Sequence, residues 1–169
     1  MKLKDPSLFR QQCYIDGVWA DADGGETIPV NNPATDEVIG TVPRMGTDET
    51  RRAIEAANRA YPAWRKRSAK ERGEILRKWY NLLLKNQDDL AVLMTTEQGK
   101  PLAEAKGEIT YAAAFIDWFA EEVKRVYGDT IPSPNDDWRI VVTKEPVGVC
   151  AAITPWNFPA AMIARKVGP

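Results

Sequence analysis

Short apolar segments separated by turn residues open the chain and predict β-strands over its first forty or so positions. Asp16-Gly17 stands between QQCYI and VWADA. This dipeptide predicts a tight hairpin, because both residues tolerate the positive φ angles of a primed turn. A second pair of segments, TIPV and EVIGTVP, flanks the turn-rich NNPATD. The front of the chain is therefore expected to form two hairpins.

Apolar residues then recur every three or four positions, a period that predicts amphipathic helices. The first of these helices is expected over residues 48–64. Ser68 and Glu71 form a capping box, in which each side chain accepts a hydrogen bond from the other residue's backbone N–H. This box predicts the start of a second helix, and Ile75, Leu76, Trp79, Leu82 and Leu83 lie along its apolar side.

Two further helices are expected before residue 128. One begins near Gln87 and ends at Gly99, since glycine suits the left-handed conformation that closes a helix. Pro101 fits the first turn of the next, which is predicted to run to about Tyr127. Its apolar stripe is broad and rich in alanine, so we expect it to pack closely against another element.

The last quarter of the chain shows a different hydrophobic pattern. WRIVVTKEP follows the loop IPSPNDD and alternates enough to predict a strand exposed on one face. VGVCAAIT is almost wholly apolar, as is typical of a strand covered on both faces in a parallel sheet. Such a strand needs parallel neighbours, each with its own crossover, and the chain has no segment left for them. We therefore predict an α/β fold and the front portion of a larger protein.

The composition narrows the range of partners. Hydrophobic residues make up 44% and charged residues 28%, and 23 basic against 24 acidic side chains leave a net charge of −1. This balance gives no electrostatic basis for binding nucleic acid or an anionic membrane. The apolar runs are too short to span a bilayer, and MKLKDPSLFRQQ lacks a signal-peptide core. A cytoplasmic protein is expected.

The chain contains no histidine. This excludes the commonest general base and metal ligand, together with any Ser-His or Cys-His pair. Cys13 and Cys150 are too few for a disulfide framework or a metal quartet, so no metal site is predicted. We expect Cys150 to lie inside the covered strand, where thiols are usually inert.

One junction near the end carries candidate chemistry. Asn157 follows the predicted strand, and Pro155 and Pro159 restrict the backbone on either side. A carboxamide held this rigidly could donate to an oxyanion that appears only during reaction. The alternative is structural, because asparagine is also a favoured N-cap and Pro159 fits the first turn of a following helix.

Several segments resemble the NAD(P)-dependent aldehyde dehydrogenase superfamily. The resemblance rests on YIDGVWADADGG, NNPATDEVIGTVP, TTEQGKPLAEAKGEITYAAAFIDWFAEE and EPVGVCAAITPWNFPAAMIARKVGP. It implies the N-terminal part of that fold: β-hairpins, helices and the start of a Rossmann-like parallel sheet. Residues 1–132 would belong to the cofactor-binding domain, 133–146 to a β extension that pairs subunits, and 147–169 to the first strand–loop–helix of the dinucleotide-binding sheet.

The resemblance also assigns roles to residues of the junction. Asn157 matches the asparagine that stabilises the thiohemiacetal oxygen, formed when a cysteine attacks the aldehyde. The preceding stretch matches one that lines the cleft for NADP or NAD, and its members are Ile153, Thr154, Pro155, Trp156 and Asn157 itself. This family binds dinucleotide without the usual glycine-rich fingerprint, and the sequence contains none.

Arg165 is the candidate for recognising the substrate. On a helix that begins near Pro159, Phe158, Met162 and Arg165 fall along one side, where the family borders its aldehyde tunnel. An arginine there could bind the far carboxylate of a small aldehyde, whereas its structural alternative is a surface residue near a helix end. The segments are most similar to the succinate-semialdehyde dehydrogenase branch of 4-aminobutyrate breakdown, and glutarate semialdehyde is the alternative substrate.

The family's nucleophilic cysteine and glutamate base come later in the full pattern, and no residue here corresponds to them. The chain alone is therefore expected to be inactive, and the complete protein is expected to be a homo-oligomer, either a dimer or a tetramer. The rival from another class is a non-catalytic, truncated assembly module. The intact mass of the natural polypeptide would separate the two.

Overall fold

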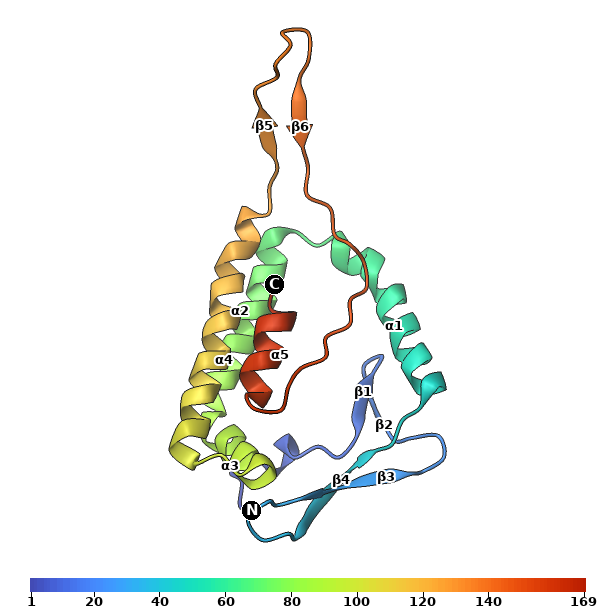
Figure 1. Cartoon of the computed structure of the whole chain (residues 1–169), viewed down its shortest axis with the longest axis vertical. Coiled ribbons are helices and arrows are strands. Elements are labelled where there is room, and N and C mark those ends of the chain that lie inside the picture. Colours follow the sequence, from blue (N-terminus) through green and yellow to red (C-terminus); the bar gives the residue numbers. More distant parts are fainter.

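The computed structural model describes residues 1–169 and shows strands at one end, a group of helices and a long protruding arm (Figure 1). The strands β1 (Cys13–Ile15) and β2 (Val18–Ala20) pair antiparallel, as do β3 (Thr27–Asn31) and β4 (Val38–Pro43). Asp16 and Gly17 have φ angles of 53° and 84°, which is the primed turn that the sequence predicts. Both predicted hairpins are confirmed.

The first two helices follow their sequence signals. Helix α1 covers Thr47–Arg65 and α2 covers Ala69–Lys85. The predicted capping box is present at the start of α2, where the Ser68 side chain accepts from the Glu71 N–H and the Glu71 carboxylate accepts from the Ser68 N–H. These hydrogen bonds from the Ser68 amide and hydroxyl lower the pKa of the Glu71 carboxyl below its usual value.

The next two helices fix the core. Helix α3 (Gln87–Gln98) ends at Gly99, whose φ of 82° is left-handed as predicted. Helix α4 covers Leu102–Glu122 and is followed by a short 3-10 turn, η2 (Val123–Arg125). The predicted continuation to Tyr127 was therefore too long: Val126, with φ −80° and ψ 74°, turns the chain out of the helix toward the arm.

The main core lies where α2, α4 and the last helix, α5 (Pro159–Val167), pack together (Figure 1). Helix α4 supplies most of the buried apolar side chains of the molecule, and most of these are alanine, as the alanine-rich stripe predicts: Ala105, Ile109, Ala112, Ala113, Ile116 and Ala120. Ala105 and Ile109 pack with Ala91 and Met94 of α3, whereas Ala112 and Ile116 pack with Ala161 and Ala164 of α5. Small side chains let helix backbones approach each other. At Gly73 of α2 the approach is so close that a Cβ would lie 2.9 Å from the carbonyl oxygen of Ala120.

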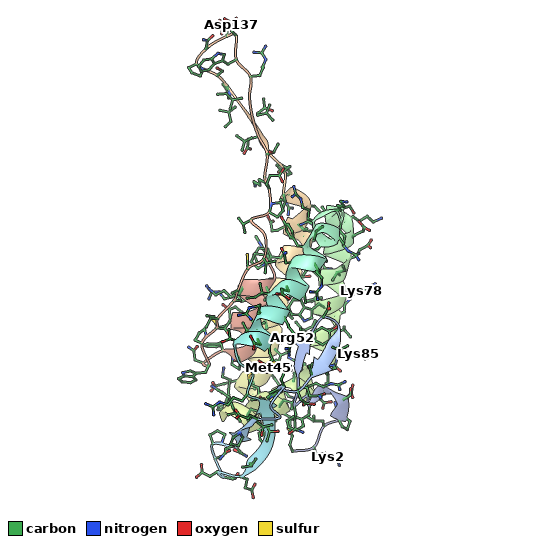
Figure 2. The ribbon with its side chains drawn as sticks, turned by 90° about the vertical axis from the view of Figure 1, so that its right-hand side faces the viewer. Lys2, Met45, Arg52, Lys78, Lys85 and Asp137 are labelled. Atoms are coloured by element: carbon green, nitrogen blue, oxygen red, sulfur yellow. The ribbon has the colours of Figure 1, made fainter.

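The arm is an antiparallel hairpin of β5 (Asp129–Ile131) and β6 (Ile140–Val142). It projects from the end of α4, and Figure 2 shows Asp137 at its tip and Lys2 near the opposite end of the molecule. The strand predicted over 138–146 is confirmed only for 140–142. Its partner β5 is too short for the sequence pattern to reveal.

The predicted doubly covered strand is not formed within this chain, and to that extent the prediction was wrong. Residues 143–155 have no regular secondary structure, and Val147 and Ile153 are 93% and 94% exposed. The reason is that every sheet present is an antiparallel pair, so the segment has no parallel neighbour. Contacts with α1 hold only its beginning, through Arg65–Glu145 at 2.7 Å and the Tyr61 hydroxyl, which donates to the Pro146 carbonyl at 3.3 Å.

None of the helices combines the length and the apolar character needed to cross a membrane.

Candidate functional site

The candidate site lies where the extended segment meets α5. Pro159 occupies the first turn of α5, as predicted, but the N-cap is Phe158 rather than Asn157. The Asn157 carboxamide takes no part in the capping of the helix, and it is exposed. The structural alternative for Asn157, a helix cap, therefore does not describe this structure, and its side chain stays free to donate elsewhere.

Two charged side chains hold the backbone at this junction. Glu108 of α4 accepts hydrogen bonds from the N–H groups of Ala160 and Ala161 through Oε1, at 2.9 and 3.2 Å. Its other oxygen pairs with the ammonium of Lys100. Lys100 in turn donates to the backbone carbonyl of Asn157 at 2.9 Å. The start of α5 is thus fixed by side chains from another part of the chain.

Sequence reasoning missed both Lys100 and Glu108. A signal for Glu108 was present, because it directly precedes Ile109 and follows Ala105 by three positions, within the buried apolar stripe of α4. A charged residue in such a stripe is almost never fully buried unless it has a partner. Lys100 gave no comparable signal, since it lies in the loop between two helices, where lysine is ordinary.

Asn157 and Phe158 line a cavity of about 340 Å³ on one side of α4. The other residues around it are Lys100, Glu104, Gly107, Glu108 and Tyr111. The cavity therefore combines an amide, two carboxylates and an ammonium with two aromatic rings. The Lys100 ammonium lies 4.2 Å from the centre of the Phe158 ring, a distance at which cation and π system attract.

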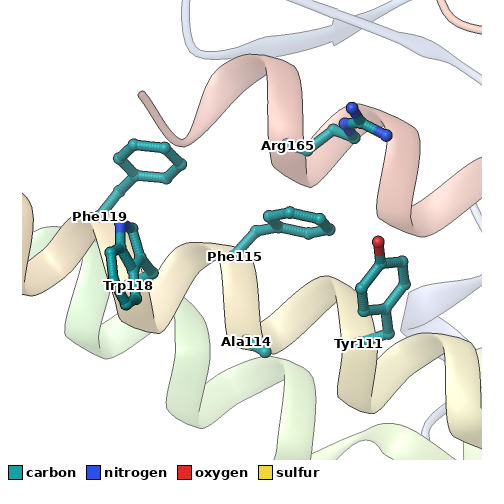
Figure 3. A pocket seen from close by; sticks show the side chains of 6 residues that line it. All are labelled: Tyr111, Ala114, Phe115, Trp118, Phe119 and Arg165. Atoms are coloured by element: carbon teal, nitrogen blue, oxygen red, sulfur yellow. The ribbon is translucent and has the colours of Figure 1, made fainter.

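Arg165 belongs to a second cavity, of about 470 Å³, which shares Tyr111 with the first. Apart from Arg165 its lining is apolar or aromatic and comes wholly from α4: Tyr111, Ala114, Phe115, Trp118 and Phe119. Figure 3 shows Arg165 on α5 facing this row, and its guanidinium carbon lies 5.9 Å from the centre of the Phe115 ring. The cation thus lies at an apolar surface.

The remaining predicted residues are less closely grouped. Met162 is half-buried on α5 and lines neither of these two cavities. Among the residues predicted to line a cofactor cleft, Ile153, Pro155 and Trp156 are exposed and Thr154 is half-buried. Their backbone groups lie outside every helix and strand, so they remain available to a ligand or to further chain.

Neither cysteine lies in the candidate site. Cys150 is exposed on the extended segment, contrary to the expectation of a buried thiol, because the strand that would bury it has no neighbours here. Its thiol donates a hydrogen bond to the Gly148 carbonyl, at 3.7 Å. Cys13 is half-buried in β1. The chain also contains no cluster of three or more side chains suited to a metal ion.

Comparison with known proteins identifies the wider setting of this site. Residues 19–169 match the aldehyde dehydrogenase family. The chain is 72% identical over its whole length to the glutarate-semialdehyde dehydrogenase of Pseudomonas putida, and 68% identical to the NADP(+) succinate-semialdehyde dehydrogenase GabD of Escherichia coli. It spans 35% of the length of each of these relatives.

Solved structures give the same result. A crystal structure of an NADP-dependent enzyme from E. coli superposes with a TM-score of 0.97 at 67% identity, over 99% of this chain and 35% of that one. The succinate-semialdehyde dehydrogenase of Burkholderia pseudomallei gives a TM-score of 0.97 at 66% identity, with the same coverage of both chains. The fold described above is therefore the N-terminal part of the fold of these enzymes.

Proposed function

The chain belongs to the aldehyde dehydrogenase family, and on that basis we propose that it is the N-terminal portion of an enzyme that oxidises a semialdehyde to the dicarboxylic acid. The cofactor would be NADP or NAD, which supplies a hydride acceptor when bound. The segment from Ile153 to Asn157 fits one wall of its cleft, because the backbone groups from Ile153 to Trp156 make no hydrogen bond within the chain and the Asn157 carbonyl is held by Lys100. The nucleophilic cysteine would come from chain beyond these residues.

In this proposal Asn157 stabilises the oxyanion. Attack of a thiolate on the aldehyde carbon breaks the carbonyl π bond and places negative charge on its oxygen. A donor that is already in position stabilises this charge without having to reorganise during the reaction. The observation that carries the proposal is that the Asn157 carboxamide is free, while the backbone around it is fixed by Lys100 and Glu108.

Arg165 would select the substrate. Two of the relatives above are named for glutarate semialdehyde and succinate semialdehyde, and a third relative, 60% identical, is the 3-sulfolactaldehyde dehydrogenase of Pseudomonas putida. Each of these aldehydes carries an anion at its other end. A guanidinium is suited to carboxylate or sulfonate, because its planar set of donors binds two oxygens at once. Arg165 is exposed but lies beside an apolar cavity, and a substrate that fills this cavity would exclude water from the charge pair and strengthen it.

The length of the substrate is the finer part of the proposal. We favour succinate semialdehyde, with four carbons, and the second candidate is glutarate semialdehyde, with five. The second is favoured by the identities of 72% and 69% to two glutarate-semialdehyde dehydrogenases of Pseudomonas species, against 68% to the succinate enzyme of E. coli. Rates of the complete enzyme with the two semialdehydes would decide between them.

We also propose that the complete protein is a cytoplasmic homo-oligomer. Support comes from the arm formed by β5 and β6, which projects from the molecule and carries exposed apolar side chains, including Ile131, Trp138 and Val141. A two-stranded ribbon is only marginally stable by itself. Pairing with a second subunit would cover these side chains and the free strand edges.

Asn157→Ala in the complete enzyme tests the proposed function. We expect kcat to fall by roughly 10² to 10³, as with the loss of another oxyanion donor, and the KM for the semialdehyde to change much less. Reduced cofactor formed at saturating substrate gives the measurement. Asn81→Ala is the matched control, because Asn81 is an exposed asparagine on α2 and should leave kcat unaltered. An Asn157→Ala enzyme with the parental kcat would contradict the oxyanion role.

A further inference from the structure

Lys100 and Glu108 form a buried ion pair, and the free energy needed to remove these two charges from water calls for an explanation. The side chains are only 10% and 1% exposed. Removing two charges from water costs free energy that their mutual attraction often fails to recover, so such a pair is weak evidence of a gain in stability. Its hydrogen bonds, however, all converge on one place, the backbone from Asn157 to Ala161.

Glu108 replaces the missing cap of α5. The first N–H groups of a helix have no partner within the helix, and Phe158, the N-cap residue, has no side-chain acceptor. The Glu108 carboxylate accepts from two of them, at Ala160 and Ala161, and its negative charge lies at the positive end of the helix dipole. A side chain of α4 therefore fixes the direction in which α5 begins.

Lys100 extends this control to the residue in front of the helix. Its ammonium donates to the Asn157 carbonyl at 2.9 Å and lies 4.2 Å from the centre of the Phe158 ring, while it pairs with Glu108. The backbone of Asn157 is thus held at its own carbonyl and, through Glu108, at the N–H groups three and four residues later. With the backbone fixed, the carboxamide has only its two side-chain torsions left to set.

We propose that Lys100 and Glu108 are positioning residues that hold the Asn157 carboxamide where the oxyanion forms. This inference rests on the proposed function, because it assigns the pair to the same reaction. Neither residue needs to contact the reacting atoms. A donor displaced by about 1 Å can lose roughly 100-fold in rate, so loosening this backbone should be visible in kcat.

Lys100→Met in the complete enzyme is the first test, since it keeps the unbranched side chain as far as Cε and removes the ammonium group. We expect kcat to fall by about tenfold to 100-fold, with little change in the KM of the cofactor. Lys106→Met is the matched control: Lys106 pairs with Asp88 at 2.7 Å on the more exposed side of α4, and its loss should leave kcat as it was. A parental kcat in Lys100→Met would overturn the positioning role.

Lys100→Met leaves Glu108 charged and unpaired, which could prevent folding. A double variant, Lys100→Met with Glu108→Gln, removes both charges together and keeps an amide oxygen that can accept from Ala160 and Ala161. It should fold and show the same loss in kcat, because the Asn157 carbonyl has lost its donor. A folded double variant with the parental kcat would count against the proposal.

A cycle with Asn157→Ala separates positioning from general damage. If Lys100 acts through the carboxamide, adding Lys100→Met to Asn157→Ala should lower kcat no further, because there is nothing left to position. Losses that multiply would mean that Lys100 acts elsewhere, and would overturn the inference. If Asn157→Ala alone keeps the parental kcat, the oxyanion role proposed for Asn157 fails, and the positioning role fails with it. If Asn157→Ala is slow but Lys100→Met has the parental kcat, only the positioning role is refuted.

Discussion

Arg165 shows what a single residue contributes at an otherwise apolar surface. Its neighbours in the cavity are aromatic or aliphatic, and no carboxylate is paired with it in the structure. A guanidinium in that position retains its hydrogen-bond donors for an incoming anion. Lys166, the next residue, is exposed as Arg165 is, but it lines neither of the cavities described above. The two adjacent cations therefore differ in what they can bind.

Arg165→Leu should separate charged from neutral substrates in the complete enzyme. A hydrogen bond to a charged group contributes about 1.5–3 kcal/mol, so kcat/KM for succinate semialdehyde should fall by roughly ten- to 150-fold. Butanal, which has the same number of carbons but no carboxylate, should lose far less. Lys166→Leu serves as the control and should affect neither substrate. Equal losses for the two aldehydes would remove Arg165 from substrate recognition.

Predictions for individual residues succeeded where the cause was local. The sequence next to Asn157 was enough to predict that prolines restrict its backbone and that α5 begins at Pro159. The contacts of Lys100 with Asn157 could not, because they join residues 57 positions apart. The roles of Asn157 and Arg165 themselves stay predictions. They depend on a bound substrate and on the part of the enzyme that supplies the nucleophilic cysteine, and neither is present here.

At the scale of whole elements, replacing glycine by alanine is expected to have opposite effects on stability in α2 and in α4. Alanine favours a helix over glycine by about 1 kcal/mol. A Cβ at Gly107 of α4 meets no atom within 4 Å, so Gly107→Ala should stabilise the protein by up to about that amount. At Gly73 of α2 the Cβ would lie 2.9 Å from the Ala120 carbonyl oxygen, so Gly73→Ala must push the helices apart.

We expect Gly73→Ala to destabilise the protein by about 1–3 kcal/mol, the usual range for overpacking. Thermal unfolding of both variants beside the parent measures the difference in Tm, and the two shifts should have opposite signs. Each variant is the control for the other, because both residues lie inside helices and both are changed from glycine to alanine. A Gly73→Ala protein as stable as the Gly107→Ala one would show that α2 and α4 can separate without loss.

Elements were predictable to the extent that their ends carry chemical signals. The capping box at Ser68, the left-handed Gly99 and the Asp16-Gly17 turn each fix a boundary through a few neighbouring atoms. The end of α4 has no such signal. The chain leaves the helix through the φ and ψ angles of Val126, and no capping residue in the sequence marks this position. Strand β5 has three residues, too few for a periodic pattern.

On the scale of the whole molecule, residues 147–154 show why a correct local pattern can give a wrong structure. Their β-branched and apolar side chains favour a covered strand, yet a strand exists only through the hydrogen bonds of its neighbours. The chain spans 35% of its relatives' length, and all its sheets are two-stranded antiparallel pairs, none of which includes this segment. The segment is therefore extended and exposed, and its assignment to a larger sheet stays a prediction.

The arm permits a prediction about assembly. Trp138 and Val141 are 60% and 68% exposed, and β5 and β6 pack mainly on each other. If a second subunit covers them, replacing both by lysine should place charges in the interface and reduce the particle mass of the complete protein toward that of one subunit. Light scattering after size exclusion at micromolar concentration measures this mass, and Val141→Ile, which keeps the apolar surface, is the control. A double-lysine protein with the parental mass and a parental Tm would mean that the arm serves some purpose other than joining subunits.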